Sequence, residues 1–287
     1  MSKCLITGAS GGLGQALYAH FAPRYATSGL CYHNHTADFL RLDLTQPGAL
    51  TELVQDLRPE LIINTVAWTD VDACDQQLAK ALALNVHTAL HVRQAAEQVG
   101  ARVVHISTND VFDGLQGLYS EADTPRPVNF YSWSKYMAEQ MFYGYAPSLI
   151  LRVHFLAWYA SGKQSFAHWL CQQLRRQQTV TLVQDQFNSP VYAGTVAHWL
   201  ESMLELTGVW HLGSGRYSRY ACGVRLAEKM GLNTDLIKPG YLHDLRFKAP
   251  RPYDVSLDCQ KVRQACGLET HLDAELDALV AAAEIAD

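Results

Sequence analysis

Short apolar runs alternate with stretches of helical period over the first 150 residues of the chain. Apolar residues recur at three- and four-residue spacing through Leu78–Val99, which predicts a long helix. Because strands that alternate with helices are joined by right-handed crossovers, this order predicts a parallel sheet. The expected strands are Lys3–Thr7, Ala26–Tyr32, Phe39–Leu42, Glu60–Asn64, Arg102–Ser107 and Ser148–Val153, and the other expected helices are Leu13–Phe21, Leu50–Leu57 and Phe130–Tyr143.

The rhythm changes after about Val153. Residues 154–180 are rich in aromatic side chains, His and Gln, and no flexible linker separates them from the residues before. We therefore expect an α/β fold, with a doubly wound parallel sheet in residues 1–153 and mainly a smaller C-terminal lobe in residues 154–287. The expected elements of the second part are a strand near 208–212 that returns to the sheet, helices at Arg219–Met230 and Leu272–Ile285, and loops at Lys238–Gly240 and Ala249–Pro252.

Composition narrows the class of protein. Hydrophobic residues make up 48% of the chain and charged residues 18%, which excludes a disordered chain. The formal net charge of −5 argues against a nucleic-acid partner, which would need a basic face. No apolar run reaches the roughly 18 residues of a membrane span, and no signal peptide is recognisable after Met1. Seven cysteines without a C-x-x-C pair predict reduced thiols, and we expect a cytoplasmic protein.

The segment Thr7–Gly14 joins the first expected strand to the first expected helix, with glycines spaced G-x-x-G-x-x-G. Glycine permits the positive φ of a tight turn, and a helix N-terminus without Cβ atoms offers its N–H groups to a pyrophosphate. A plain glycine turn is the alternative, but the flanking strand and helix favour a Rossmann-type NAD(P)-binding domain in residues 1–153. The candidate cofactor contacts in this loop are Gly8, Ser10, Gly11, Gly12, Leu13 and Gly14.

The end of the second expected strand bears on the choice of cofactor. A carboxylate there would bind the 2′-hydroxyl of NAD, but Cys31–His35 contains none and the first acid is Asp38. We therefore expect NADPH, with NADH as the alternative, and His33 as a candidate contact. The two histidines of this segment lack the partners of a metal site, so we expect no metal. Asp43 either accepts a hydrogen bond from the adenine or caps the next helix.

Tyr131 and Lys135 open the expected helix and lie four residues apart, so they share one helix face. A phenol has a pKa of about 10, and a neighbouring ammonium would lower it, so that Tyr131 could exchange a proton near neutral pH. A hydroxyl at the end of the preceding strand would complete the site, because ligands bind beyond the carboxyl ends of parallel strands. Ser107 or Thr108 supplies this hydroxyl, unless it is an ordinary strand-end cap.

These residues make the chain resemble the extended short-chain dehydrogenase/reductases, and more specifically the dTDP-4-dehydrorhamnose reductase family. The downstream pair of Tyr131 and Lys135 is more specific than the glycines, because binding a dinucleotide does not require it. Besides the glycine loop, the matching segments are Asn64–Asp72, His105–Gly114, Tyr131–Lys135, Leu151 with Arg152, Asp185–Pro190 and Arg251–Asp258, which together span nearly the whole chain.

The resemblance implies that NADPH or NADH reduces the 4-keto group of a nucleotide-linked 6-deoxy sugar. By position, Tyr131 would donate the proton, Lys135 would hold the nicotinamide ribose and Thr108 would orient the carbonyl. The implied cofactor contacts are Gly11, Gly12 and Leu13 at the pyrophosphate, Asp43 and Leu44 at the adenine, and Val66, Ala67 and Trp68 as a wall; the implied substrate contacts are Thr108, Asn109, Asp110, Phe155 and Arg251.

The chain departs from the family where the family faces its sugar nucleotide. Thr108 is followed by Asn109 and Asp110 where Asp-Tyr is common, Phe155 replaces a common Trp, and Ala157 replaces a Tyr. The reductive residues are therefore intact while the substrate wall is altered. An epimerase, or a reductase of another carbonyl substrate, is the first alternative, and a non-catalytic NADP-binding regulatory subunit is the second. We expect a sugar-nucleotide substrate, no membrane partner, and a monomer or homodimer.

Overall fold

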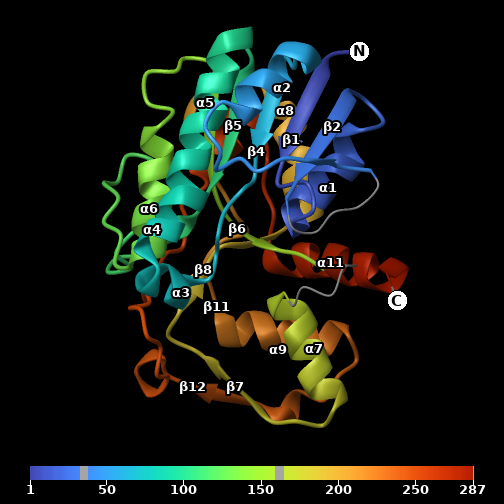
Figure 1. Ribbon diagram of the computed structural model, residues 1–287. Helices are drawn as coiled ribbons and strands as arrows, with labels where there is room; N and C mark the ends of the chain where they lie inside the picture. Colours follow the sequence, from blue (N-terminus) through green and yellow to red (C-terminus); the bar gives the residue numbers. More distant parts are fainter. Residues whose placement is uncertain (33–37, 159–164, 287) are drawn as a thin grey trace.

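The computed structural model describes residues 1–32, 38–158 and 165–286. Its centre is an eight-stranded sheet in the order β10-β6-β5-β4-β1-β2-β3, with β9 paired to the far end of β6. Every pairing in this sheet is parallel, which confirms the predicted fold class (Figure 1). The strands are β1 Lys3–Thr7, β2 Ala26–Cys31, β3 Leu40–Arg41, β4 Leu61–Asn64, β5 Arg102–Ser107, β6 Ser148–Leu156, β9 Pro190–Tyr192 and β10 Gly208–Leu212.

Helices cover both faces of the sheet, which is why its central strands are apolar along their whole length. On one face, α1 (Gly12–Phe21) packs against α8 (Ala193–Ser202). On the other face lie α2 (Ala49–Leu57), α5 (Thr88–Val99) and α6 (Phe130–Gln140). All four residues of β4 are buried between these layers.

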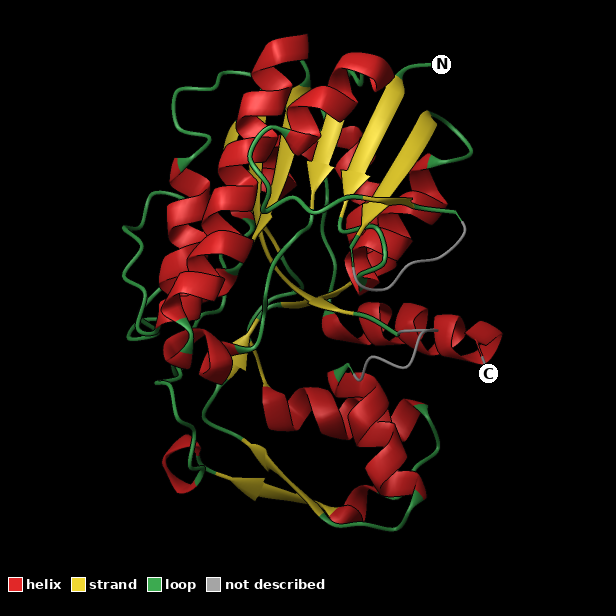
Figure 2. Ribbon diagram, in the orientation of Figure 1, coloured by secondary structure: helices red, strands yellow, loops and turns green. Residues whose placement is uncertain are grey.

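A smaller lobe with its own apolar core lies beyond the carboxyl ends of the strands (Figure 2). Its helices are α7 (Phe166–Arg175), α9 (Arg219–Lys229) and α11 (Leu272–Ala286). Its strands form two small pairs, β7 Val180–Val183 parallel to β12 Ile237–Gly240, and β8 Phe187–Asn188 antiparallel to β11 Tyr217–Ser218. The remaining elements are α3 Val71–Gln76, α4 Leu78–Ala81, α10 Gln260–Cys266, and short 3-10 turns at Asn109–Val111, Thr234–Leu236 and Leu242–Asp244.

Strand β6 belongs to both parts of the molecule. Its first residues pair with β5 and β10 in the main sheet, whereas His154–Leu156 pair with β9. The strand therefore continues three residues beyond the predicted end at Val153. It leads the chain directly from the sheet to the wall of the smaller lobe.

The predicted helix Leu78–Val99 is interrupted by a π-helical segment, η1, at Leu82–His87. The extra residue in this turn places Asn85 in the interior. There its side-chain amide accepts a hydrogen bond from the Trp68 backbone N–H (2.7 Å) and donates one to the Ser134 hydroxyl (2.7 Å). The interruption thus fixes the segment after β4 against α6.

The predicted loop Lys238–Gly240 is wrong, because these residues form most of strand β12. Pro239 lies opposite Leu182 of β7 in a two-stranded sheet. A strand in such a pair is an edge strand, and its outward side needs no N–H donor, so proline is tolerated. Among the described residues, no helix is long and apolar enough to cross a membrane.

Candidate active site

The glycine loop turns tightly between β1 and α1. Gly8 has a φ of +71°, a conformation that side chains rarely adopt. A Cβ atom on Gly14 would lie 2.2 Å from the Gly8 carbonyl oxygen, so this position needs glycine for packing. Gly11, in contrast, has an ordinary φ of −77°, and its Cβ would contact only Gly8 O, at 3.2 Å. The first and third glycines therefore shape the loop, while the second leaves space beside it.

A cavity of about 380 Å³ opens at this loop. It brings together residues from the ends of β1, β2, β3 and β4, at the edge of the sheet where nucleotides bind in such folds. The predicted cofactor contacts that line it are Gly8, Ser10, Gly11, Asp43, Leu44, Val66, Ala67 and Trp68. Gly12, Leu13 and Gly14 are buried behind the loop and do not line the cavity, and His33 lies outside the described residues.

Asp43 orders the turn after β3, at one end of this cavity. Its carboxylate accepts hydrogen bonds from the Thr45 backbone N–H (2.9 Å) and hydroxyl (2.7 Å). Helix α2 begins only after Gly48, so Asp43 does not cap it. Of the two alternatives for Asp43, the helix cap is therefore wrong.

Arg41 is a basic residue at this end that the sequence prediction missed. It pairs in register with Cys31, so the carboxyl ends of β2 and β3 lie side by side. Its guanidinium lies 5.6 Å from the centre of the Tyr32 ring, and Tyr32 lines the cavity. The sequence does place Arg41 at the end of the strand that follows β2. Its position beside the end of β2 can be inferred only once the register between β2 and β3 is known.

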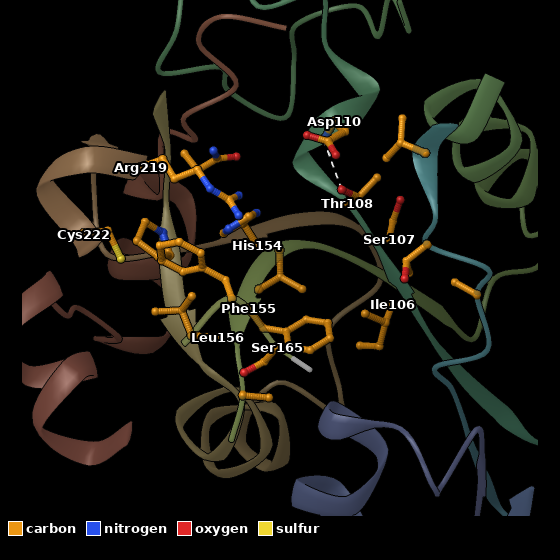
Figure 3. Close-up of a pocket in the computed structure, with 18 of the residues that line it drawn as sticks. Ile106, Ser107, Thr108, Asp110, His154, Phe155, Leu156, Ser165, Arg219 and Cys222 are labelled. Atoms are coloured by element: carbon orange, nitrogen blue, oxygen red, sulfur yellow. Dashed lines mark hydrogen bonds between the residues drawn. The ribbon is translucent and has the colours of Figure 1, made fainter. Parts of the chain in front are cut away.

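The second cavity, of about 310 Å³, brings together Thr108, Tyr131 and Lys135. Thr65 and Ala67 line both cavities, so the two are adjacent. Thr108 follows β5, whereas Tyr131 and Lys135 lie in the first turns of α6, which begins after Asn129 accepts a hydrogen bond from the Ser132 N–H (2.9 Å). The geometry therefore places three groups from two segments of the chain in one cavity. Figure 3 labels Thr108 in this cavity, next to Ser107 and Asp110.

The environment of Tyr131 differs from the one expected. Lys135 was predicted to lower the pKa of the phenol, but burial raises it well above its ordinary value, and the nearby Asp110 carboxylate raises it further. A hydrogen bond with the Thr108 side chain acts in the opposite direction. The phenol is thus held in its protonated form at neutral pH.

Lys135 is buried and donates a hydrogen bond to the Ile106 carbonyl oxygen (2.8 Å). Burial lowers the pKa of its ammonium to about 8, and the Glu139 carboxylate acts in the opposite direction. An ammonium has three N–H donors, so the hydrogen bond to Ile106 leaves others for a ligand. Lys135 is therefore fixed by the backbone of β5 and charged up to about pH 8.

A buried ionic network supports Lys135 from one turn further along α6. The Glu139 carboxylate accepts hydrogen bonds from Arg152 Nη2 (2.7 Å) and Nε (2.9 Å), and from the Ser107 hydroxyl (2.5 Å). Arg152 and Glu139 are 4% and 2% exposed, so the pair is shielded from water. Because the Ser107 hydroxyl is engaged in this network, Thr108 is the hydroxyl that faces Tyr131.

The predicted substrate contacts separate into two groups. Asp110 and Phe155 line the second cavity, as does Ala157, and burial raises the pKa of Asp110 to about 6. Asn109 lies behind the wall, where its amide donates hydrogen bonds to Asn188 Oδ1 (2.9 Å) and to the carbonyl oxygen of Val255 (3.0 Å).

Arg251 also lies outside the cavity lining. Its guanidinium forms an ion pair with Asp72 (2.9 Å) and donates to the Ala249 carbonyl oxygen. It still acts on the cavity through its charge, which lowers the pKa of Asp110 against the effect of burial.

Comparisons with known proteins cover almost the whole chain. The family model described as the RmlD substrate binding domain matches residues 2–284. The dTDP-4-dehydrorhamnose reductase of Aggregatibacter actinomycetemcomitans is 28% identical over 94% of this chain and 95% of its own. A probable low-salt glycan biosynthesis reductase, Agl14, of Haloferax volcanii is 31% identical over 96% and 97%. The crystal structure of a hypothetical dTDP-4-dehydrorhamnose reductase from Sulfolobus tokodaii superposes with a TM-score of 0.86, at 32% identity, over 95% of this chain and 98% of that one.

Proposed function

The chain belongs to the RmlD substrate binding domain family, and we propose that it is an NAD(P)H-dependent oxidoreductase of the extended short-chain dehydrogenase/reductase type. In this proposal it reduces the 4-keto group of a nucleotide-linked 6-deoxy sugar. One observation carries it: Thr108, Tyr131 and Lys135 line a single cavity that adjoins the cavity of the glycine loop. A hydride donor and a carbonyl substrate need such adjacent sites, because the reacting atoms must come within contact distance.

The residues present fit a dinucleotide. The space beside Gly11 would be filled by any side chain, and the loop lies before the N-terminus of α1, where N–H groups favour a pyrophosphate. Gly8, Ser10 and Gly11 would hold the pyrophosphate, Asp43 and Leu44 the adenosine, and Val66, Ala67 and Trp68 the inner wall. Lys135 would hold the nicotinamide ribose with the N–H groups that Ile106 does not use.

The chemistry of the chain's own residues suits reduction. The cofactor, when bound, supplies the hydride. Tyr131, whose raised pKa keeps the phenol protonated, donates its proton to the carbonyl oxygen as that oxygen becomes a hydroxyl. The Thr108 hydroxyl hydrogen-bonds the same oxygen and fixes its position beside Tyr131. Lys135 stabilises the phenolate that remains after the transfer.

The first test is turnover with a dTDP-4-keto-6-deoxyhexose, followed by the loss of NADPH absorbance. A reductase or epimerase of another carbonyl substrate would bind NADPH but prefer a different nucleotide sugar. A regulatory subunit would bind NADPH and turn over none of them, and the intact set of three residues argues against it. We further propose that the enzyme acts in the cytoplasm, since a chain with seven cysteines and no C-x-x-C pair suits a reducing compartment, and that it is a monomer or homodimer.

Gly11→Val is expected to abolish cofactor binding while leaving the protein folded. The backbone of Gly11 suits any residue, and its Cβ meets only one atom, so the added methyl groups fill the pyrophosphate space. NADPH titration checks the loss, and circular dichroism checks the fold. An unchanged Kd for NADPH in the folded variant would contradict the assignment of this loop.

Arg41→Ser is expected to weaken NADPH binding by about tenfold and to leave NADH binding unchanged, because a guanidinium near the end of β2 can pair with the 2′-phosphate. Fluorescence titration of both cofactors checks it, with wild type favouring NADPH. Equal losses for the two cofactors would mean that Arg41 acts on the fold and not on the phosphate.

A further inference from the structure

The catalytic cavity has a second polar wall, opposite Thr108 and Asp110, which the reaction described above does not use. It is formed by His154 at the far end of β6 and by Arg219, the first residue of α9 (Figure 3). Neither residue stood out in the sequence, because 64 positions separate them. They meet because β6 extends past the main sheet to pair with β9, directly beside the smaller lobe.

Arg219 is held in place without being neutralised. Its guanidinium lies 4.3 Å from the centre of the Phe166 ring, a contact that orients the planar group and leaves its N–H donors unused. Within residues 1–32, 38–158 and 165–286, no carboxylate lies at ion-pair distance from this guanidinium. Asp110 is the one acidic side chain among the described residues that line the cavity, and it belongs to the opposite wall.

His154 complements this charge. Burial, together with the positive charge of Arg219, lowers the pKa of its imidazole to about 4, so the ring is neutral at physiological pH. A neutral imidazole has one N–H donor and one acceptor nitrogen, and the described residues give His154 no hydrogen-bond partner. The guanidinium of Arg219 and the neutral imidazole of His154 therefore face the same cavity.

The Arg219 side chain is exposed in the open cavity, so its guanidinium is accessible to an anionic group of a ligand that enters there. We propose that Arg219 and His154 form an oxyanion-binding subsite that holds a phosphate or carboxylate group of the substrate while Tyr131 acts at its carbonyl. This inference rests on the proposed function, because it concerns the same cavity. It makes Arg219 a specificity-determining residue: a neutral sugar or simple ketone would fill the catalytic end and leave this end unmatched.

The test measures binding by calorimetry in the presence of NADPH, with four probes that separate the two sources of the anion. Thymidine and dTDP differ by the diphosphate, and dTDP-glucose and dTDP-glucuronic acid differ by the carboxylate. The variants are Arg219→Gln, Arg219→Lys and the control Arg263→Gln. Arg263→Gln also removes one positive charge, but Arg263 forms an exposed ion pair with Glu269 and does not line the cavity.

For a diphosphate, Arg219→Gln is expected to raise the Kd of dTDP and of both sugar nucleotides by about 10- to 100-fold, since a hydrogen bond to a charged group is among the stronger contacts. If the subsite binds a carboxylate instead, Arg219→Gln is expected to remove only the tighter binding of dTDP-glucuronic acid relative to dTDP-glucose. In both cases Arg219→Lys recovers part of the affinity, because it keeps the charge but loses the fork, and Arg263→Gln behaves as wild type.

A second readout needs no variant. An anion bound beside His154 stabilises the imidazolium, so NMR titration of the wild-type protein should show its pKa rising from about 4 when the tighter-binding probe is present. The subsite would be overturned if each probe bound Arg219→Gln with the same Kd as wild type. It would also be overturned if no anionic probe bound the wild-type protein at millimolar concentration. A failure of the proposed function gives a different result. The protein would then turn over no keto sugar, although Arg219→Gln still weakened the binding of the anionic probes.

Discussion

Replacing Tyr131 with Phe should lower kcat by about 10²- to 10⁴-fold, the usual contribution of a positioned proton donor. The phenyl ring keeps the packing of a side chain that is only 7% exposed, and only the hydroxyl beside Thr108 is lost. The Kd of NADPH should therefore stay close to that of wild type. Steady-state oxidation of NADPH with a dTDP-4-keto-6-deoxyhexose measures the first quantity, and fluorescence titration the second.

Two further variants distinguish the role of Tyr131 from the roles of Thr108 and Lys135. Thr108→Val should mainly lower kcat, because the carbonyl loses an orienting hydrogen bond. Lys135→Met should weaken both cofactor binding and turnover, because it removes a ribose contact and the charge beside the phenolate. A Tyr131→Phe enzyme with near wild-type turnover would rule out this residue as the proton donor.

Replacing Glu139 with Gln should lower the free energy of unfolding by about 3–5 kcal/mol, because it leaves the guanidinium of Arg152 buried without its countercharge. The amide has nearly the same shape, so lost packing contributes little. Urea denaturation at neutral pH measures the change. The control is Glu97→Gln, which removes an exposed i,i+4 pair with Arg93 and should cost about 0.5 kcal/mol or less.

The same substitution also tests how the network acts on Lys135. The Glu139 charge raises the pKa of the ammonium against the larger effect of burial, which lowers it to about 8. Without that charge the pKa falls further, so Lys135 loses its proton at lower pH. The basic limb of the kcat/KM profile should therefore move to lower pH in Glu139→Gln and stay in place in Glu97→Gln. If the free energy of unfolding of Glu139→Gln lay within 1 kcal/mol of wild type, Glu139 would not be the countercharge that stabilises buried Arg152. If the basic limb of its kcat/KM profile did not move, Glu139 would not set the pKa of Lys135.

Much of the sheet could be predicted, because local pattern decides it. Lys3–Thr7 and Arg102–Ser107 are strands with the predicted bounds, since each is a short apolar run that is buried after its first residue. The pairing of Tyr131 with Lys135 was equally readable, because residues four apart on a helix must share a face. Their position beside Thr108 then follows from the order of the strands.

What could not be predicted depends on contacts between distant segments. The strand at Lys238–Gly240 pairs with β7, which lies far from it in the sequence. The helix changes to a π-helical segment after Ala81, where Asn85 is held by Trp68 and Ser134. The pKa of Tyr131 was misjudged for the same reason. Spacing alone showed the nearby ammonium but not the burial of the phenol or the carboxylate of Asp110.

The continuity of β6 has a consequence for how new specificity can arise in this protein. Arg152, which anchors Glu139 beneath Lys135, and His154, which lines the substrate wall, are two residues apart on one strand and so extend from the same side of it. A mutation at position 154 that shifts the strand would therefore also disturb Lys135, and in the proposed mechanism selection for a new substrate there would lower turnover. Arg219 lies on a separate helix of the smaller lobe and is free of that coupling. In directed evolution we expect position 219 to accept many substitutions with unchanged kcat on small substrates, and position 154 to accept few.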